Sequence, residues 1–266
     1  MLAIDSAGAG APLVLLHGVG TSKTIWSRAL PRLAERRRAL APDLPGFGAS
    51  APAGHGFDLA RVADALADGL APHVEAPFDL VGNSLGGAVA VVLALHRPEL
   101  VHRLVLVAPA GFAPYPAAVA RAAGEIGARL TAARRTLGPP IAGRAAARRV
   151  LLWGVVGDPA RLSAGDARTM LRASRGASCI AEATAAVMVA DLRPRLAELA
   201  MPWGLIWGDR DRVVRIATLS AIRAVAPQAP VETLRGAGHV PHFECPRDFA
   251  AALERLLERL DPVGGA

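Results

Sequence analysis

Short apolar runs, each bounded by Gly, Pro or Asp, recur along the chain with helix-like stretches between most of them. Runs of this length suit buried β-strands, and their alternation with helical patterns is typical of βα units in a mostly parallel sheet. The predicted strands cover residues 12–16, 38–41, 78–81, 103–107, 202–207 and 231–234. We therefore predict an α/β fold in which a mostly parallel central sheet is flanked by helices.

The alternation breaks between Phe112 and Ala200, where Ala- and Arg-rich helical segments run without a buried strand between them. Outside this region, residues 59–71 and 249–260 carry apolar side chains at helical spacing, which predicts core-facing helices. We interpret 112–200 as a helical insertion, and 1–111 together with 201–266 as one core domain. A chain of 266 residues with 52% hydrophobic content is long enough to bury the core of such a domain.

The chain has a formal net charge of +7, which raises the question of an anionic partner. Residues 112–200 hold thirteen arginines and six acidic residues, so the whole excess lies in the insertion. Lys23 is the one lysine of the chain, and genomic composition explains so strong a preference for arginine more simply than ligand binding does. The arginines are then a solvated surface. The alternative is that an anionic carrier or a carboxylated substrate docks on the basic insertion.

Other features exclude several classes of protein. Aromatic residues make up only 4% and no recognition motif accompanies the charge, so we expect no nucleic-acid partner. No apolar run approaches the ~20 residues that span a bilayer, and the N-terminal residues lack the pattern of a signal peptide, so we expect a cytoplasmic protein. Cys179, Cys245 and the scattered histidines match no ligand spacing. We therefore expect neither a metal nor a cofactor.

The segment "GNSLGG", residues 82–87, follows a predicted strand and precedes the apolar run "AVAVVLALH". A G-x-S-x-G pattern between a strand and a helix is typical of a nucleophile elbow, a strained turn that exposes a serine hydroxyl. The glycines are needed because a Cβ would collide where strand and helix approach. The alternative is that Ser84 belongs to an ordinary turn, since the pattern alone is short.

A serine needs a base, and the base needs an orienting acid, to attack a carbonyl near neutral pH. "GLIWGDRDRVV" ends a strand and presents Asp209 and Asp211, while "GAGHVPHFE" follows another strand and presents His239. The chain order of serine, aspartate and histidine is the one that this kind of site uses. We predict that Ser84, His239 and one of the two aspartates form a catalytic triad.

The loop in "LLHGVG" supplies a further element of the site, because its backbone N–H groups follow a strand that ends at Leu16. Attack on an ester creates an oxyanion, which backbone N–H groups can stabilise. We predict that the N–H groups of Val19 and Leu85 form this oxyanion hole. His17 is interpreted as shaping the loop, and Asp43 as stabilising the turn in "PDLPGFG".

Five blocks resemble the α/β-hydrolase superfamily, in its branch of small bacterial hydrolases with a cap: "VLLHGVGTSKTIW", "APDLPGFGAS", "LVGNSLGGAVAVVLALHRPELVHRLVLVAPAG", "LIWGDRDRVV" and "GAGHVPHFECP". They occur in the family's order and cover nearly the whole chain. In that family the acid is usually the last residue of a G-x-x-D stretch, so the resemblance selects Asp211 over Asp209. It also implies that residues 112–200 are the cap.

The resemblance implies a serine hydrolase that cleaves a small ester, lactone or thioester through an acyl-enzyme on Ser84. A carbon–carbon bond hydrolase is an alternative, but those relatives usually carry a tryptophan directly after the catalytic histidine, and here that residue is Val240. A perhydrolase or acyltransferase differs only in the acceptor of the acyl group. Epoxide hydrolases and dehalogenases are disfavoured because they place an aspartate where Ser84 stands. From another class, a non-catalytic ligand-binding member of the fold would use the same pocket.

Four residues are candidates for lining the substrate pocket: Asn83 and Val240, beside the triad, and Trp26 and Trp153. For the two tryptophans a place in the core or on the insertion is an equally good interpretation. The pocket itself is expected to hold a small acyl substrate.

Overall fold

The computed structural model describes residues 1–261, so the last five residues of the second predicted core segment lie outside it. A seven-stranded sheet forms its centre, in the order β1-β3-β2-β4-β5-β6-β7. The strands are β1 (Ile4–Ala7), β2 (Pro12–Leu16), β3 (Arg38–Pro42), β4 (Phe78–Asn83), β5 (Val101–Val107), β6 (Trp203–Gly208) and β7 (Val231–Leu234). All neighbours are parallel except β1 and β3, which confirms a mostly parallel sheet.

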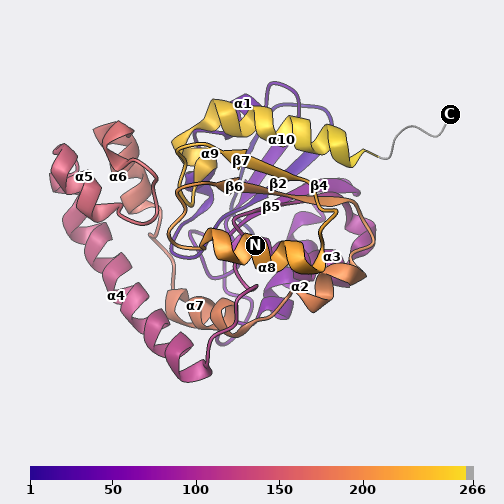
Figure 1. Ribbon diagram of the computed structural model, residues 1–266, viewed down its shortest axis with the longest axis horizontal. Coiled ribbons are helices and arrows are strands. Elements are labelled where there is room, and N and C mark those ends of the chain that lie inside the picture. The colour runs from indigo at the N-terminus through magenta and orange to yellow at the C-terminus, as the bar shows by residue number, and fades with distance from the viewer. Residues whose placement is uncertain (262–266) are drawn as a thin grey trace.

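Helices cover both faces of the sheet (Figure 1). They are α1 (Leu30–Leu33), α2 (Leu59–Leu70), α3 (Leu85–His96), α8 (Ile216–Val225), α9 (Pro241–Glu244) and α10 (Pro246–Leu260). Side chains alternate along each strand, so Leu13 and Leu15 join the core beneath α1 and α10, while Val14 and Leu16 join the core beneath α2 and α3. The two faces therefore carry separate apolar cores.

The insertion between β5 and β6 is helical, as predicted, and consists of α4 (Ala117–Ile141), α5 (Ala145–Leu151), α6 (Ala164–Arg172) and α7 (Ile180–Val189). Figure 1 shows α4 as a long helix at the side of the core, with α5 and α6 near one end and α7 near the other. Close backbone approaches fix this arrangement. A Cβ on Gly124 would lie 2.3 Å from the Ala181 carbonyl oxygen of α7, and one on Gly157 would lie 2.3 Å from that of Gly236 in the core.

One strand was not predicted. The residues of β1 are half-buried or exposed, and "IDSA" lacks the apolar run that identifies the inner strands. It forms the edge of the sheet by pairing antiparallel with β3. None of the helices between residues 1 and 261 combines the length and apolar character needed to cross a membrane.

Candidate active site

Ser84 lies at the carboxyl end of β4, in the turn that leads into α3. Its backbone has φ 54° and ψ −116°, a conformation that a non-glycine residue adopts only under strain. The neighbouring glycines make the turn sterically feasible, because a Cβ on Gly82 would lie 2.3 Å from the Gly86 carbonyl oxygen and one on Gly86 would lie 2.6 Å from that of Leu16. The local geometry is that of the predicted elbow.

The structure brings His239 and Asp211 together from the loops that follow β7 and β6. His239 Nδ1 lies 2.8 Å from Asp211 Oδ2, and both side chains are buried. The other carboxylate oxygen, Oδ1, accepts hydrogen bonds from the backbone N–H groups of Val213 and Val214. Since the carboxylate accepts, Nδ1 carries a proton in the neutral imidazole and Nε2 keeps a free lone pair. Asp209 instead accepts a hydrogen bond from the Gly236 N–H.

Asn83 holds the strand ends in place around this pair. Its side-chain amide donates to the carbonyl oxygens of Val107, at 3.1 Å, and of His239, at 3.0 Å. The two hydrogen bonds connect the elbow to β5 and to the histidine loop. Asn83 therefore fixes the backbone of His239 relative to Ser84.

The loop after β2 is shaped by His17, as the sequence predicted. His17 Nε2 accepts a hydrogen bond from the Leu44 N–H at 2.9 Å, so Nδ1 carries the proton and donates to the Gly18 carbonyl oxygen. Burial lowers the pKa of His17 to about 4, and the imidazole is therefore neutral near pH 7. Asp43 accepts from the N–H groups of Lys23 and Ala49, which is the turn-stabilising role predicted for it.

The predicted oxyanion donors are the backbone N–H groups of Val19, in the loop after β2, and of Leu85, directly after Ser84. Leu85 is the first residue of α3, where an N–H has no partner within the helix. Among residues 1–261 the N–H of Val19 donates to no backbone carbonyl. Gly18 packs against the elbow, since a Cβ there would lie 3.2 Å from the Ser84 Cβ.

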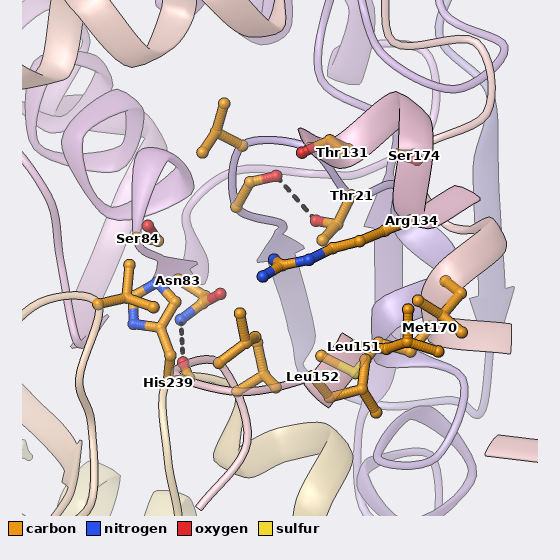
Figure 2. A pocket seen from close by; sticks show the side chains of 17 residues that line it. Thr21, Asn83, Ser84, Thr131, Arg134, Leu151, Leu152, Met170, Ser174 and His239 are labelled. Atoms are coloured by element: carbon orange, nitrogen blue, oxygen red, sulfur yellow. Dashed lines mark hydrogen bonds between the residues drawn. The ribbon is translucent and has the colours of Figure 1, made fainter. Parts of the chain in front are cut away.

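A cavity of about 200 Å³ opens at this end of the sheet. Ser84, His239 and Val19 line it from the core, and Figure 2 shows the imidazole of His239 beside Ser84. Apolar side chains cover much of the remaining wall, namely Leu151, Leu152, Val155, Met170, Leu171 and Val240. The insertion contributes the first five of these, so it forms one wall of the cavity.

Two of the four pocket candidates, Asn83 and Val240, line the cavity, but the two tryptophans do not. Trp26 is fully buried in the core, where it stacks on His242 with a centroid distance of 3.9 Å. Trp153 is 64% exposed, and the Arg212 guanidinium lies 5.9 Å from its ring centroid. The apolar character of a tryptophan predicts that its ring packs against other side chains. It does not indicate whether those side chains belong to the core or to a pocket.

Sequence reasoning missed Glu244, which lies at the end of α9. Its carboxylate accepts hydrogen bonds from the Gly238 N–H, at 2.9 Å, and from the Gly157 N–H of the insertion, at 2.8 Å. The His239 N–H donates to the Val155 carbonyl oxygen beside it. Burial raises the pKa of Glu244, and these backbone hydrogen bonds act in the opposite direction. Glu244 therefore joins the histidine loop to the insertion.

The two cysteines are free thiols that lie outside the cavity lining. Burial raises the pKa of Cys179 to about 11 and that of Cys245 to about 12, so neither is a thiolate near neutral pH. Among residues 1–261, no group of three or more His, Cys, Asp or Glu side chains is arranged to hold a metal ion.

A mostly parallel sheet, a serine in a strained turn after a central strand and a helical insertion before β6 together define the α/β-hydrolase fold. A family model described as "Alpha/beta hydrolase family" matches residues 13–252, which is most of the chain. The protein belongs to this family.

Relatives in the family include proteins with different named activities. A pimeloyl-[acyl-carrier protein] methyl ester esterase of Chromobacterium violaceum is 32% identical over 97% of this chain and 98% of its own length. A 2-hydroxymuconate semialdehyde hydrolase of a Pseudomonas species is 42% identical, over 41% of this chain and 40% of its own. Among solved structures, a hydrolase from Pseudomonas aeruginosa has a TM-score of 0.75 at 30% identity, covering 96% of this chain and 94% of that one.

Proposed function

We propose that the protein is a serine hydrolase that cleaves a small carboxylic ester, with Ser84, His239 and Asp211 as its catalytic triad. One observation carries this proposal: the serine in the strained elbow and the histidine paired with a buried aspartate line the same cavity. Strain at a buried turn persists where the surrounding structure enforces it, and it is concentrated at functional sites. Val19, which is proposed to supply one oxyanion donor, lines the same cavity.

In the proposed first step, the Ser84 Oγ attacks the ester carbonyl carbon while His239 Nε2 takes the hydroxyl proton. The tetrahedral intermediate collapses, the bond to the leaving alkoxide breaks, and the imidazolium returns the proton to that oxygen. Water then attacks the acyl-enzyme, again losing its proton to His239, which passes it to Ser84 as the acid is released. Asp211 holds the imidazole in the required tautomer throughout and stabilises the imidazolium.

The N–H groups of Val19 and Leu85 are proposed to stabilise the oxyanion in both steps. Within residues 1–261, no hydrogen bond joins Ser84 Oγ to the imidazole, whose Nδ1 lies against Asp211. In unliganded enzymes this contact is often long and tightens when substrate binds. Loss of one oxyanion donor typically raises the barrier by about 3 kcal/mol.

Two observations favour an ester over a carbon–carbon bond. The named esterase matches this chain over nearly its full length, whereas the named carbon–carbon relative matches less than half. Val240, which follows His239 and lines the cavity, stands where carbon–carbon hydrolases usually carry a tryptophan. Carbon–carbon hydrolysis remains the second candidate because that relative is the more identical over the part it matches.

Two further candidates use the same site. Perhydrolases and acyltransferases would transfer the acyl group to an acceptor other than water, and a non-catalytic member of the family would bind the ligand without reacting.

Residues 112–200 are proposed to act as the cap. Their exposed arginines would attract anionic substrates, and an anionic carrier is the alternative to a small carboxylated molecule.

Hydrolysis of p-nitrophenyl esters of increasing chain length tests the proposal. We expect a short optimal acyl chain, because the cavity of about 200 Å³ is smaller than a drug-sized pocket. Ser84→Ala is expected to lower kcat by at least about 10⁴-fold. Full activity in folded Ser84→Ala, or turnover of a ring-fission diketone but of no ester, would overturn the assignment.

A further inference from the structure

The cavity contains one permanently charged side chain among the described residues that line it, Arg134 of α4. Three other arginines of the insertion donate to backbone carbonyl oxygens: Arg135 to Ser174, Arg148 to Ala142 and Arg168 to Pro139. Arg134 donates to no protein group within residues 1–261, although it is half-buried. A cation placed in a mostly apolar cavity without a partner indicates that its counter-charge comes with the ligand.

Figure 2 shows the direction of the Arg134 side chain. Its guanidinium extends across the cavity toward the side that carries Ser84 and Asn83. The side chain is thus directed into the cavity. A guanidinium in this position presents N–H groups in a planar fork, which matches the two oxygens of a carboxylate.

An independent observation comes from Ser174, which follows α6 and lines the same cavity. Ser174 is only 2% exposed, and its hydroxyl has no hydrogen-bond partner within residues 1–261. A buried hydroxyl without a partner costs free energy, so a ligand group that accepts its proton would recover that cost. Thr131, one turn before Arg134 on α4, adds a second hydroxyl at this wall.

We propose that Thr131, Arg134 and Ser174 form a carboxylate subsite, and that the substrate is an ester bearing a second, free carboxylate, such as a monoester of a short dicarboxylic acid. The proposal rests on the proposed function for the reaction itself, but the subsite can be tested by binding alone. Arg134 and Ser174 would hold the free carboxylate while the ester carbonyl lies at Ser84. Arg134 is in this account a residue that determines specificity and takes no part in the chemical steps.

Binding is measured first, in Ser84→Ala, by calorimetry with monomethyl adipate and with its neutral amide analogue, methyl adipamate. We expect the carboxylate ligand to bind more tightly than the amide. Adding Arg134→Gln should weaken the carboxylate ligand by about tenfold or more and leave the amide unchanged, because a hydrogen bond to a charged group is lost only with the former. Arg134→Lys should retain part of the preference, and Ser174→Ala should reduce it about threefold to tenfold.

Arg129→Gln is the matched control, because Arg129 is exposed on the same helix and does not line the cavity. It removes the same charge from α4 and should leave both affinities unchanged. Three results would each overturn the subsite. Arg134→Gln could weaken both ligands equally, or Arg129→Gln could weaken the carboxylate ligand as much as Arg134→Gln does. The third is that the Ser84→Ala parent does not bind the carboxylate ligand.

Hydrolysis of the monomethyl esters of succinate, glutarate and adipate is measured next. In Arg134→Gln we expect KM for the best of these esters to rise about tenfold while kcat changes little, and KM for the neutral amide ester to stay constant. If carboxylate binding depends on Arg134 but no ester is cleaved, the subsite stands and the esterase proposal fails. If esters are cleaved but neither binding nor KM depends on Arg134, the esterase proposal stands and the subsite proposal fails.

Discussion

At the scale of single residues, His242 is a buried polar side chain that lies outside the cavity lining. Its imidazole is fully buried against Trp26, and neither ring nitrogen has a partner within residues 1–261. Burial, and to a smaller extent the charge on His239, lowers the pKa of His242 to about 3. The folded protein therefore holds this ring neutral, whereas the unfolded chain protonates it below its ordinary pKa of 6.5.

Replacing His242 with phenylalanine should make the protein less sensitive to acid. The stability that the neutral ring contributes is fully present above pH 6.5 and is lost as the pH falls toward the folded-state pKa of about 3. Between about pH 7 and pH 5 the wild type should lose about 2 kcal/mol more unfolding free energy than His242→Phe. Urea unfolding at the two pH values measures this. Because the change in unfolding free energy between the two pH values is taken within each protein, any pH-independent cost of fitting the larger ring cancels. Equal changes in the wild type and in His242→Phe would contradict the prediction.

Residue types and spacing located Ser84, His239 and two candidate aspartates, because a nucleophile, an acid and a base at strand ends have few alternative explanations. The family resemblance selected Asp211, which the structure pairs with His239, and the catalytic roles stay predictions. Trp26 was a candidate for both the pocket and the core, because a large apolar ring is stabilised equally well in either environment, and it lies in the core. Glu244 carried no sequence signal, since its importance comes from backbone groups that only the folded chain brings within reach.

At the scale of elements, α9 connects the histidine loop to the insertion through Glu244. Glu244→Gln replaces one carboxylate oxygen by an N–H donor that faces the N–H of Gly238 or Gly157, so the loop before His239 loses an acceptor. We expect kcat to fall about tenfold, or about 1.4 kcal/mol in the barrier, with KM almost unchanged.

Ester hydrolysis by Glu244→Gln, with unfolding measured in parallel, checks this prediction. Asp248→Asn is the control: it removes the same charge from the exposed first turn of α10, and it should retain wild-type kcat. A loss of stability without a change in kcat would show that Glu244 supports only the fold.

Strands β2 to β6 were predicted because most of their residues form buried apolar runs. The half-buried edge strand β7 was also predicted, and all six predicted strands occur within two residues of their observed bounds. Edge strand β1 was not, because only one of its four residues is strongly apolar and its stability comes from pairing with β3. The helical character of the insertion followed from its composition. The close approach of Gly157 to Gly236, which brings the insertion against the histidine loop, requires the folded backbone.

At the scale of the whole molecule, the sheet and the insertion contribute different residues to the site. The sheet places Ser84, Asp211 and His239 at the ends of β4, β6 and β7, where ligands bind in open α/β folds. The insertion supplies most of the apolar wall and Arg134. Sequence patterns predict the first contribution well. The second depends on how α4 lies over the core, so the substrate class could not be predicted from residue order.

The central claim is that Ser84 is an activated nucleophile, and the intact mass after reaction with a fluorophosphonate probe tests it most directly. The wild type should gain the mass of one adduct, and Ser84→Ala, shown to be folded by circular dichroism, should gain none. An adduct of equal yield in both proteins, or none in a folded wild type, would contradict the account.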